Sequence, residues 1–231
     1  MKKSLKLGVF LMGVGVVLSS VSFVLAKPGE IDFAKVLTRD LTYEKVTHGI
    51  TPNPDQMTTD NIHGLKVDSD SFDITIKSGD QFSVTEIDNS EKDLFQSQVV
   101  DHQLLVGPTS AKTNKSLAGT AQIEITIPSS AKLDNITVQT KNGDIKLQQV
   151  YANQVQLTNT NGDIELSQVT IAGGGNVTNK NGDIEVEQSQ LPIVEAQTKS
   201  GSLSMKRAYH VGYGDGANLH LMNQSGDVDL D

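Results

Sequence analysis

A short motif, Asn-Gly-Asp-Ile, recurs in the C-terminal part of the chain and constrains the fold more than any other feature. It occurs three times, with its glycine at positions 143, 162 and 182, and returns in looser form around Gly201 and Gly226. These glycines are 19, 20, 19 and 25 residues apart. A fixed period of about 20 residues is typical of repeat architectures, in which each copy is one supersecondary unit.

Each copy has apolar residues at alternate positions on both sides of its glycine. In the first copy they are Val138 before the glycine, and Ile145 and Leu147 after it. A period of two predicts β-strands with one buried face. Asparagine and glycine tolerate positive φ and therefore suit a tight turn between the strands. The residues that we assign to these turns are Asn142, Gly143, Asp144, Asn161, Gly162, Asp163, Asn181, Gly182, Asp183, Gly201 and Gly226.

Two all-β folds satisfy this pattern. One is a β-solenoid similar to a single-stranded parallel β-helix, with about 20 residues per coil, and the other is a meander of antiparallel hairpins. The position three residues before each glycine favours the solenoid, because it is always a small polar residue: Thr140, Asn159, Asn179, Thr198 or Asn223. In a solenoid these side chains stack about 4.8 Å apart and can hydrogen-bond along their own column.

The sequence divides into four predicted segments. Residues 1–26 are a signal peptide or transmembrane anchor, and residues 27–60 are a juxtamembrane spacer. Residues 61–128 contain alternating runs without a regular period and form an irregular β lead-in. Residues 129–231 form the regular solenoid.

The first segment predicts where the protein is located. Lys2, Lys3 and Lys6 precede residues 7–26, which carry no charged side chain. As a hydrophobic helix, this stretch would be about 30 Å long, the thickness of a bilayer core. The full length of the stretch favours a single-pass anchor, and the alternative is a signal peptide that is cleaved after Ala26. In both cases we expect the rest of the chain outside the cytoplasm, anchored at the cell membrane or secreted.

The composition argues against several kinds of site. The chain has no cysteine, which rules out disulfides, thiolate metal sites and a cysteine nucleophile. Its five histidines show no metal-ligand spacing. No phosphate loop, dinucleotide fingerprint or Gly-x-Ser-x-Gly motif is present. A formal net charge of −9 makes nucleic acid a poor partner. We therefore expect no catalytic residue, no cofactor and no metal.

The recurring aspartates leave one metal hypothesis open. Asp144, Asp163, Asp183 and Asp227 could form a column of carboxylates, and Ca²⁺ prefers oxygen ligands. The calcium-binding β-helix repeat, however, is a glycine-rich nonapeptide, which these longer copies lack. We therefore favour the interpretation that aspartate is present because it suits an exposed turn.

One loop is a candidate contact site. Tyr209, His210 and Tyr213 lie in a glycine-rich stretch that lengthens the spacing between the last two copies. Aromatic side chains on such a loop could contact a sugar or a protein. The simpler interpretation is an insertion that one coil tolerates.

The alternating run from Ile123 to Pro128, the strand from Leu133 to Val138 and the repeated Asn/Ser-Gly-Asp-Ile motif together resemble a known family. This is the bacterial putative-adhesin family, a cell-envelope domain of β-strand repeats whose function is unknown. The resemblance covers about residues 60–231. It implies an extracytoplasmic β-solenoid, and it implies no established catalytic residues.

These observations predict a non-enzymatic cell-envelope protein that acts as an adhesin-like module. Its partner would be an envelope protein or a glycan, and residues 7–26 would hold it in the membrane if they are retained. One alternative is a regulatory ectodomain that senses envelope stress. Another is a polysaccharide-active β-helix enzyme. The enzyme is disfavoured because the acids recur once per copy, whereas glycoside hydrolysis needs one clustered carboxylate pair.

Overall fold

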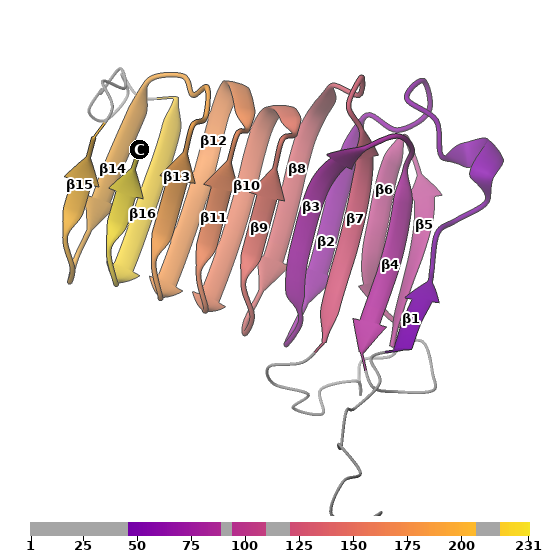
Figure 1. The fold of residues 1–231 in the computed structure, drawn as a ribbon, viewed down its shortest axis with the longest axis horizontal. Coiled ribbons are helices and arrows are strands. Elements are labelled where there is room, and N and C mark those ends of the chain that lie inside the picture. The colour runs from indigo at the N-terminus through magenta and orange to yellow at the C-terminus, as the bar shows by residue number, and fades with distance from the viewer. Residues whose placement is uncertain (1–45, 89–93, 110–120, 207–217) are drawn as a thin grey trace, which may run out of the picture. The chain divides into compact units, whose positions relative to one another are not determined.

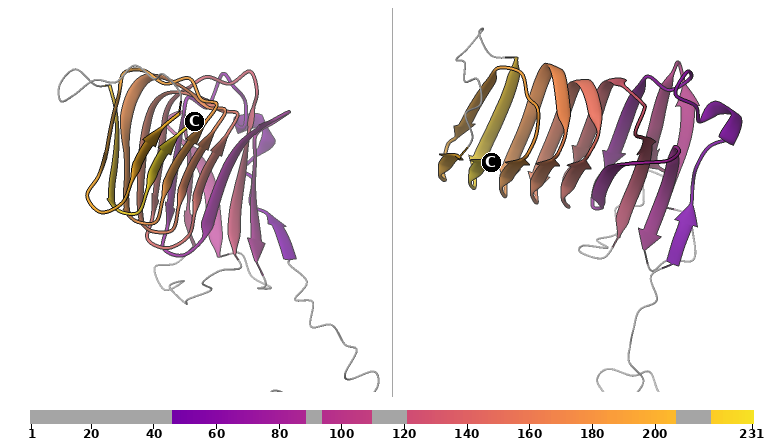
Figure 2. Two further views of the ribbon diagram at one scale, coloured as in Figure 1. Left: turned by 60° about the vertical axis from the view of Figure 1, so that its left-hand side comes forward. Right: turned by 45° about the horizontal axis from the view of Figure 1, so that its top comes forward.

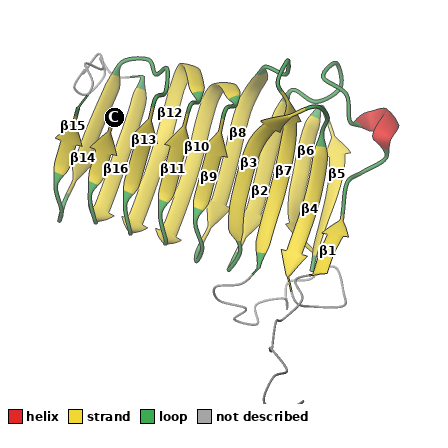
Figure 3. Ribbon diagram, in the orientation of Figure 1, coloured by secondary structure: helices red, strands yellow, loops and turns green. Residues whose placement is uncertain are grey.

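The computed structural model describes residues 46–88, 94–109, 121–206 and 218–231, all within one compact unit, Glu44–Asp231. The predicted N-terminal helix and contact loop lie outside these ranges. The described part is all-β, as predicted, and consists of strands with one short 3₁₀ helix, η1 (Pro54–Gln56) (Figure 3). Within it, no helix is long and apolar enough to span a bilayer.

The strands form two sheets, which we call sheet A and sheet B (Figure 1). Sheet A has nine strands in the order β1 (Val46–Gly49), β4 (Ser83–Asp88), β7 (Gln122–Pro128), β3 (Asp73–Gly79), β9 (Ile145–Gln148), β11 (Ile164–Ser167), β13 (Ile184–Glu187), β17 (Val228–Leu230) and β15 (Leu203–Met205). Sheet B has eight, in the order β14 (Val194–Thr198), β16 (Leu219–Ser225), β12 (Thr170–Asn181), β10 (Tyr151–Asn161), β8 (Leu133–Thr140), β2 (Gly64–Ser69), β6 (Gln103–Pro108) and β5 (Phe95–Val100).

The chain winds from sheet B to sheet A once in every repeat. Strand β8 is followed by β9, β10 by β11 and β12 by β13, and each strand pairs in parallel with its counterpart in the next coil. Ile145, Ile164 and Ile184 are direct partners in adjacent strands. The repeats therefore stack as solenoid-like coils. The hairpin meander is wrong for residues 133–231, because their strands pair in parallel.

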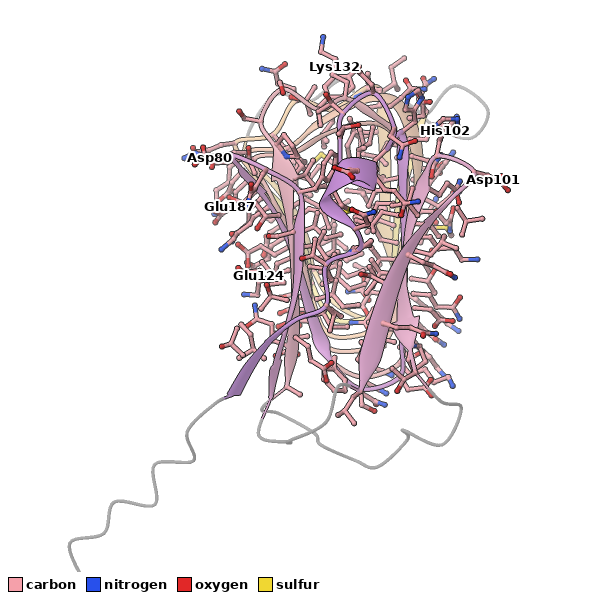
Figure 4. All side chains as sticks on the ribbon, turned by 90° about the vertical axis from the view of Figure 1, so that its right-hand side faces the viewer. Asp80, Asp101, His102, Glu124, Lys132 and Glu187 are labelled. Carbon is pink, nitrogen blue, oxygen red and sulfur yellow. The ribbon has the colours of Figure 1, made fainter. Side chains whose placement is uncertain are left out.

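The apolar side chains of both sheets meet in one core. Ile145, Ile164 and Ile184 are fully buried there. Viewed end-on, the two sheets form separate layers with side chains filling the space between them (Figure 4). A single coil has too few apolar side chains to offset its own ordering entropy, so stability depends on stacked neighbours.

At both ends of the array, the coils are not stacked in sequence order (Figure 2). The last coil, β16 and β17, lies between the β12–β13 coil and the β14–β15 coil. The first coil, β2 and β3, similarly lies between β6–β7 and β8–β9. The outermost strands at the C-terminal end are therefore β14 and β15.

The N-terminal end of the core is closed by non-repeat elements. Met57 and Ile62 are buried in the core on either side of a turn that follows η1, and η1 lies across the space between the two layers (Figure 4). Glu86 is also fully buried, and its carboxylate accepts the backbone N–H groups of Leu94 and Phe95 at 3.0–3.1 Å. A polar group is tolerated here because hydrogen bonds compensate for its desolvation.

Candidate interaction surface

The aspartates of the repeat turns form a ladder of hydrogen bonds between coils. The backbone N–H of Asp163 donates to Oδ1 of Asp144 at 2.9 Å, and that of Asp183 donates to Oδ1 of Asp163 at 2.8 Å. The N–H of Asp227 donates to Oδ1 of Asp183 at 2.7 Å. Each carboxylate thus satisfies a backbone donor that the turn leaves outside the sheet ladder, so the column has a structural role.

The ladder has one further member at each end, of which the repeat motif revealed only the one in the copy around Gly201. Asp73 accepts the N–H of Asp144 at 2.9 Å, and Ser202 donates its N–H to Asp227 at 2.7 Å. Asp73 was missed because Phe72 precedes it in place of the Asn-Gly pair. Ser202 shows that the outermost coil has no carboxylate at this position.

Substitution of Asp163 distinguishes this structural role from calcium binding. Asp163→Ala removes the acceptor for the N–H of Asp183, and we expect a loss of about 1 kcal/mol in the free energy of unfolding. Asp163→Asn keeps an oxygen acceptor and should lose clearly less. Urea unfolding measures both, and melting temperatures should be unchanged by calcium or a chelator. Equal losses in the two variants, or a calcium-dependent melting temperature, would contradict the ladder as the main role.

The inward asparagine column differs from the prediction in its hydrogen bonds. Nδ2 of Asn159 donates to the backbone oxygen of Gly143 at 2.9 Å, and Nδ2 of Asn179 donates to that of Gly162 at 2.9 Å. The stacked amides therefore bond to backbone of the neighbouring coil rather than to one another. They do so because the glycine carbonyl of each turn points toward the next coil and needs a donor.

Amide-to-amide ladders occur instead on the surface. Asn161 donates to Oδ1 of Asn142 at 2.9 Å on the glycine-turn side. On the opposite side, Gln149 donates to Gln168 at 2.7 Å and Gln168 to Gln188 at 3.1 Å. These three glutamines have φ of 56°, 55° and 48°. They form a second set of repeat turns that the sequence analysis missed, although their spacing matches that of the glycines.

The outer face of sheet A is acidic near its C-terminal end. Glu165, Glu185, Glu187 and Asp229 point outward from three adjacent strands, and Lys146 pairs with Glu165 at 2.9 Å. The hydrogen bond with Glu165 raises the pKa of Lys146 above its ordinary value. Partial burial, together with the neighbouring Glu165 and Glu187 carboxylates, raises the pKa of Glu185. Among the described residues, no three histidine, aspartate or glutamate side chains are arranged to hold a metal ion.

The outer face of sheet B is chemically different and contains a hollow of about 730 Å³, which we call the sheet B hollow. It crosses four successive strands: β10, β12, β16 and β14. One row of outward side chains consists of Thr158, Thr178, Met222 and Gln197, which are register partners from strand to strand. The second row lies two residues further along and consists of Thr160, Lys180, Gln224 and Lys199.

The sheet B hollow combines hydrogen-bonding groups, one apolar side chain and positive charge. No carboxylate lines it. Met222 is 48% exposed within it. Within the part of the chain that the structure describes, neither Lys180 nor Lys199 forms an ion pair. The hollow is therefore a candidate for ligand contact on this surface.

The family model called Toastrack DUF4097 matches residues 62–231. The chain belongs to the Toastrack DUF4097 family. The match covers every repeat coil, and it is consistent with the resemblance to the putative-adhesin family. A comparison with curated protein sequences finds no match.

Solved structures resemble this chain to different degrees. A putative cell adhesion protein from Clostridium sporogenes has 12% sequence identity and a TM-score of 0.57, covering 81% of this chain and 99% of its own. A putative adhesin from Bacteroides fragilis has 14% identity and a TM-score of 0.33, covering 81% and 97%. A putative lipid binding protein from Parabacteroides distasonis has 12% identity and a TM-score of 0.29, with the same coverage. Only the first similarity is close enough to support a shared fold.

The predicted site residues of this Toastrack domain fall into two groups. The turn residues around Gly143, Gly162 and Gly182 lie at the coil corners and take part in the ladders described above. Tyr209, His210 and Tyr213 lie in residues 207–217, outside the described residues, so the contact-loop hypothesis stays a prediction. The sheet B hollow was not predicted, because its lining residues come from coils that are neighbours only in the folded chain.

Proposed function

We propose that this protein is a non-enzymatic interaction module of the bacterial cell envelope, displayed outside the cytoplasm, that binds its partner through the outer face of sheet B. The observation that carries the proposal is the sheet B hollow, whose lining residues supply hydroxyl, amide, thioether and ammonium groups. The neighbouring carboxylate of Glu195 accepts a hydrogen bond from Gln197 and contacts His220. Such a mixture suits recognition of a polar ligand and lacks the paired acids of a glycosidase.

The distribution of acidic residues further supports a binding role over catalysis. The turn aspartates each accept a backbone hydrogen bond from the next coil. The sheet A acids recur in register along adjacent strands, as expected for a solvated face. Neither the turn aspartates nor the sheet A acids form a single carboxylate pair beside a cavity as large as the sheet B hollow. The names of the adhesion-type structures are consistent with this proposal.

The location is proposed from the first 26 residues. Their basic start and uncharged stretch fit either a retained anchor or a signal peptide cleaved after Ala26. Mass spectrometry of the mature N-terminus would separate the two. A retained segment would keep the alternative of a sensor ectodomain open.

The proposal is tested with the full chain in a bacterial host, carrying a C-terminal epitope. Protease added to intact spheroplasts should remove the epitope if the module is outside. Purified protein should also sediment with isolated cell-wall material. Protection from protease until the membrane is lysed, or no sedimentation with the wall, would contradict the proposal.

A further inference from the structure

The sheet B hollow differs in charge from the outer face of sheet A. The chain carries a formal net charge of −9, and the outer face of sheet A is acidic on β11, β13 and β17. Lys180 and Lys199 are exposed in the hollow. The carboxylate at its edge, Glu195, is engaged by Gln197 and His220 rather than by either lysine. An anionic ligand is therefore repelled from the acidic face and attracted to this one.

The two lysines lie two strands apart across sheet B. Lys180 belongs to β12, and Lys199 directly follows β14, with β16 between these strands. Two strand spacings correspond to about 9.6 Å across the sheet. This interval is comparable with the length of a disaccharide, so a linear polymer crossing the strands could present one acidic group to each lysine.

The remaining side chains suit the body of a sugar polymer. The hydroxyls of Thr158, Thr160 and Thr178 both donate and accept hydrogen bonds. Gln224 lies between the two lysines and offers an amide to sugar hydroxyls. Met222 provides an exposed, polarisable apolar surface for the C–H face of a ring.

The position of β16 brings these groups together. Met222 pairs in register with Thr178 on one side and with Gln197 on the other. If the coils stacked in sequence order, β14 would lie beside β12, and Lys199 would be only one strand spacing from Lys180. The inserted C-terminal coil thus sets the separation of the lysines and places Met222 at the centre of the hollow.

We propose that the sheet B hollow binds a linear acidic polysaccharide that lies across strands β10, β12, β16 and β14, with Lys180 and Lys199 contacting its carboxylates. The inference rests on the proposed function and specifies the ligand class of the same surface. No covalent step is involved. Affinity should fall as salt concentration rises, because exposed charges are screened.

The test measures binding of the full chain to hyaluronan oligosaccharides, which carry a carboxylate on every second sugar. We expect the double variant Lys180→Gln/Lys199→Gln to lose about tenfold or more in affinity, since each lysine contributes a charge-assisted hydrogen bond. The methyl ester of hyaluronan, which lacks the negative charge, should bind no better than the variant does. Circular dichroism and melting temperature should be unchanged.

The matched control is Lys66→Gln/Lys132→Gln. It makes the same change in net charge, but neither lysine lines the sheet B hollow, and Lys66 is on the outer face of the same sheet. The control should bind hyaluronan like the unmodified chain. Equal losses in both double variants would indicate a diffuse charge effect and overturn the site.

Three other outcomes would overturn the inference. The first is no binding of the unmodified chain to hyaluronan, and the second is equal binding to its methyl ester. The third is stronger Lys180- and Lys199-dependent binding to phosphatidylglycerol-containing phosphatidylcholine vesicles, which would assign the hollow to a lipid surface. In each case, sedimentation of the chain with cell-wall material would leave the proposed function standing, whereas loss of sedimentation as well would reject both.

Discussion

Gly162→Val should destabilise the fold by about 4 kcal/mol or more, an exceptional loss for a single substitution. Gly162 has a φ of 121°, a conformation that β-branched residues essentially do not adopt. An added Cβ would also lie against the backbone oxygen of Gly143 and 2.9 Å from Oδ1 of Asp144. Backbone cannot move aside without breaking the ladder to the next coil. The loss is measured by urea unfolding monitored by circular dichroism.

Gly107→Val is the matched control for this substitution. Gly107 lies in β6 of sheet B, and an added Cβ there has no atom within 4 Å. Valine is favoured in strands, so this variant should unfold within about 0.5 kcal/mol of the unmodified protein. If Gly162→Val and Gly107→Val had the same urea midpoint, the turn glycine would not be required by the stacking of the coils.

Removal of residues 218–231 should release two coils rather than one. The deleted segment contains β16 and β17, whose Leu219, Leu221, Val228 and Leu230 are fully buried. Each contributes about 1.5–3 kcal/mol through burial. Among the described strands, β14 and β15 pair only with β16 and β17, so they lose these strand partners when the last coil is removed. We expect amide hydrogens of residues 194–205 to exchange at the rate of an unfolded chain.

Strands β12 and β13 provide an internal reference in the same experiment. They keep β10 and β11 as partners on their other side, so their amides should stay protected in the shortened chain. Protected amides in β14 and β15 would mean that this coil can stack directly on β12 and β13. That outcome would contradict the requirement for an inserted C-terminal coil.

The local features of the repeat were predictable because they depend on neighbouring residues alone. Alternation around Ile145, Ile164 and Ile184 predicted which side chains are buried, and all three are. Gln149, Gln168 and Gln188 were overlooked, although they recur with the same period, because glutamine is not a usual residue at positive φ. The first coil was also overlooked, because Phe72 precedes Asp73 where later copies have glycine, so the motif is not recognisable there.

The candidate site could not be predicted in the same way. The sheet B hollow combines Thr158, Thr178, Met222 and Gln197, which are neighbours only across strands. If the coils stacked in sequence order, the strand of Met222 would be the outermost one, beyond the strand of Gln197. A surface made by several coils depends on which coils are adjacent, and that information is absent from any single copy of the motif.

The sequence by itself determined the period of the repeat, the order of strands and turns in each copy, and the inward or outward direction of its side chains. These properties follow from side-chain alternation and from the φ values that each residue tolerates. Only the tertiary structure decided the order of the coils at the two ends, and with it the lysine spacing on sheet B. The physical reason is that every copy presents nearly the same hydrogen-bonding edge and apolar face, so the local pattern permits several neighbours, and packing of the whole array selects one.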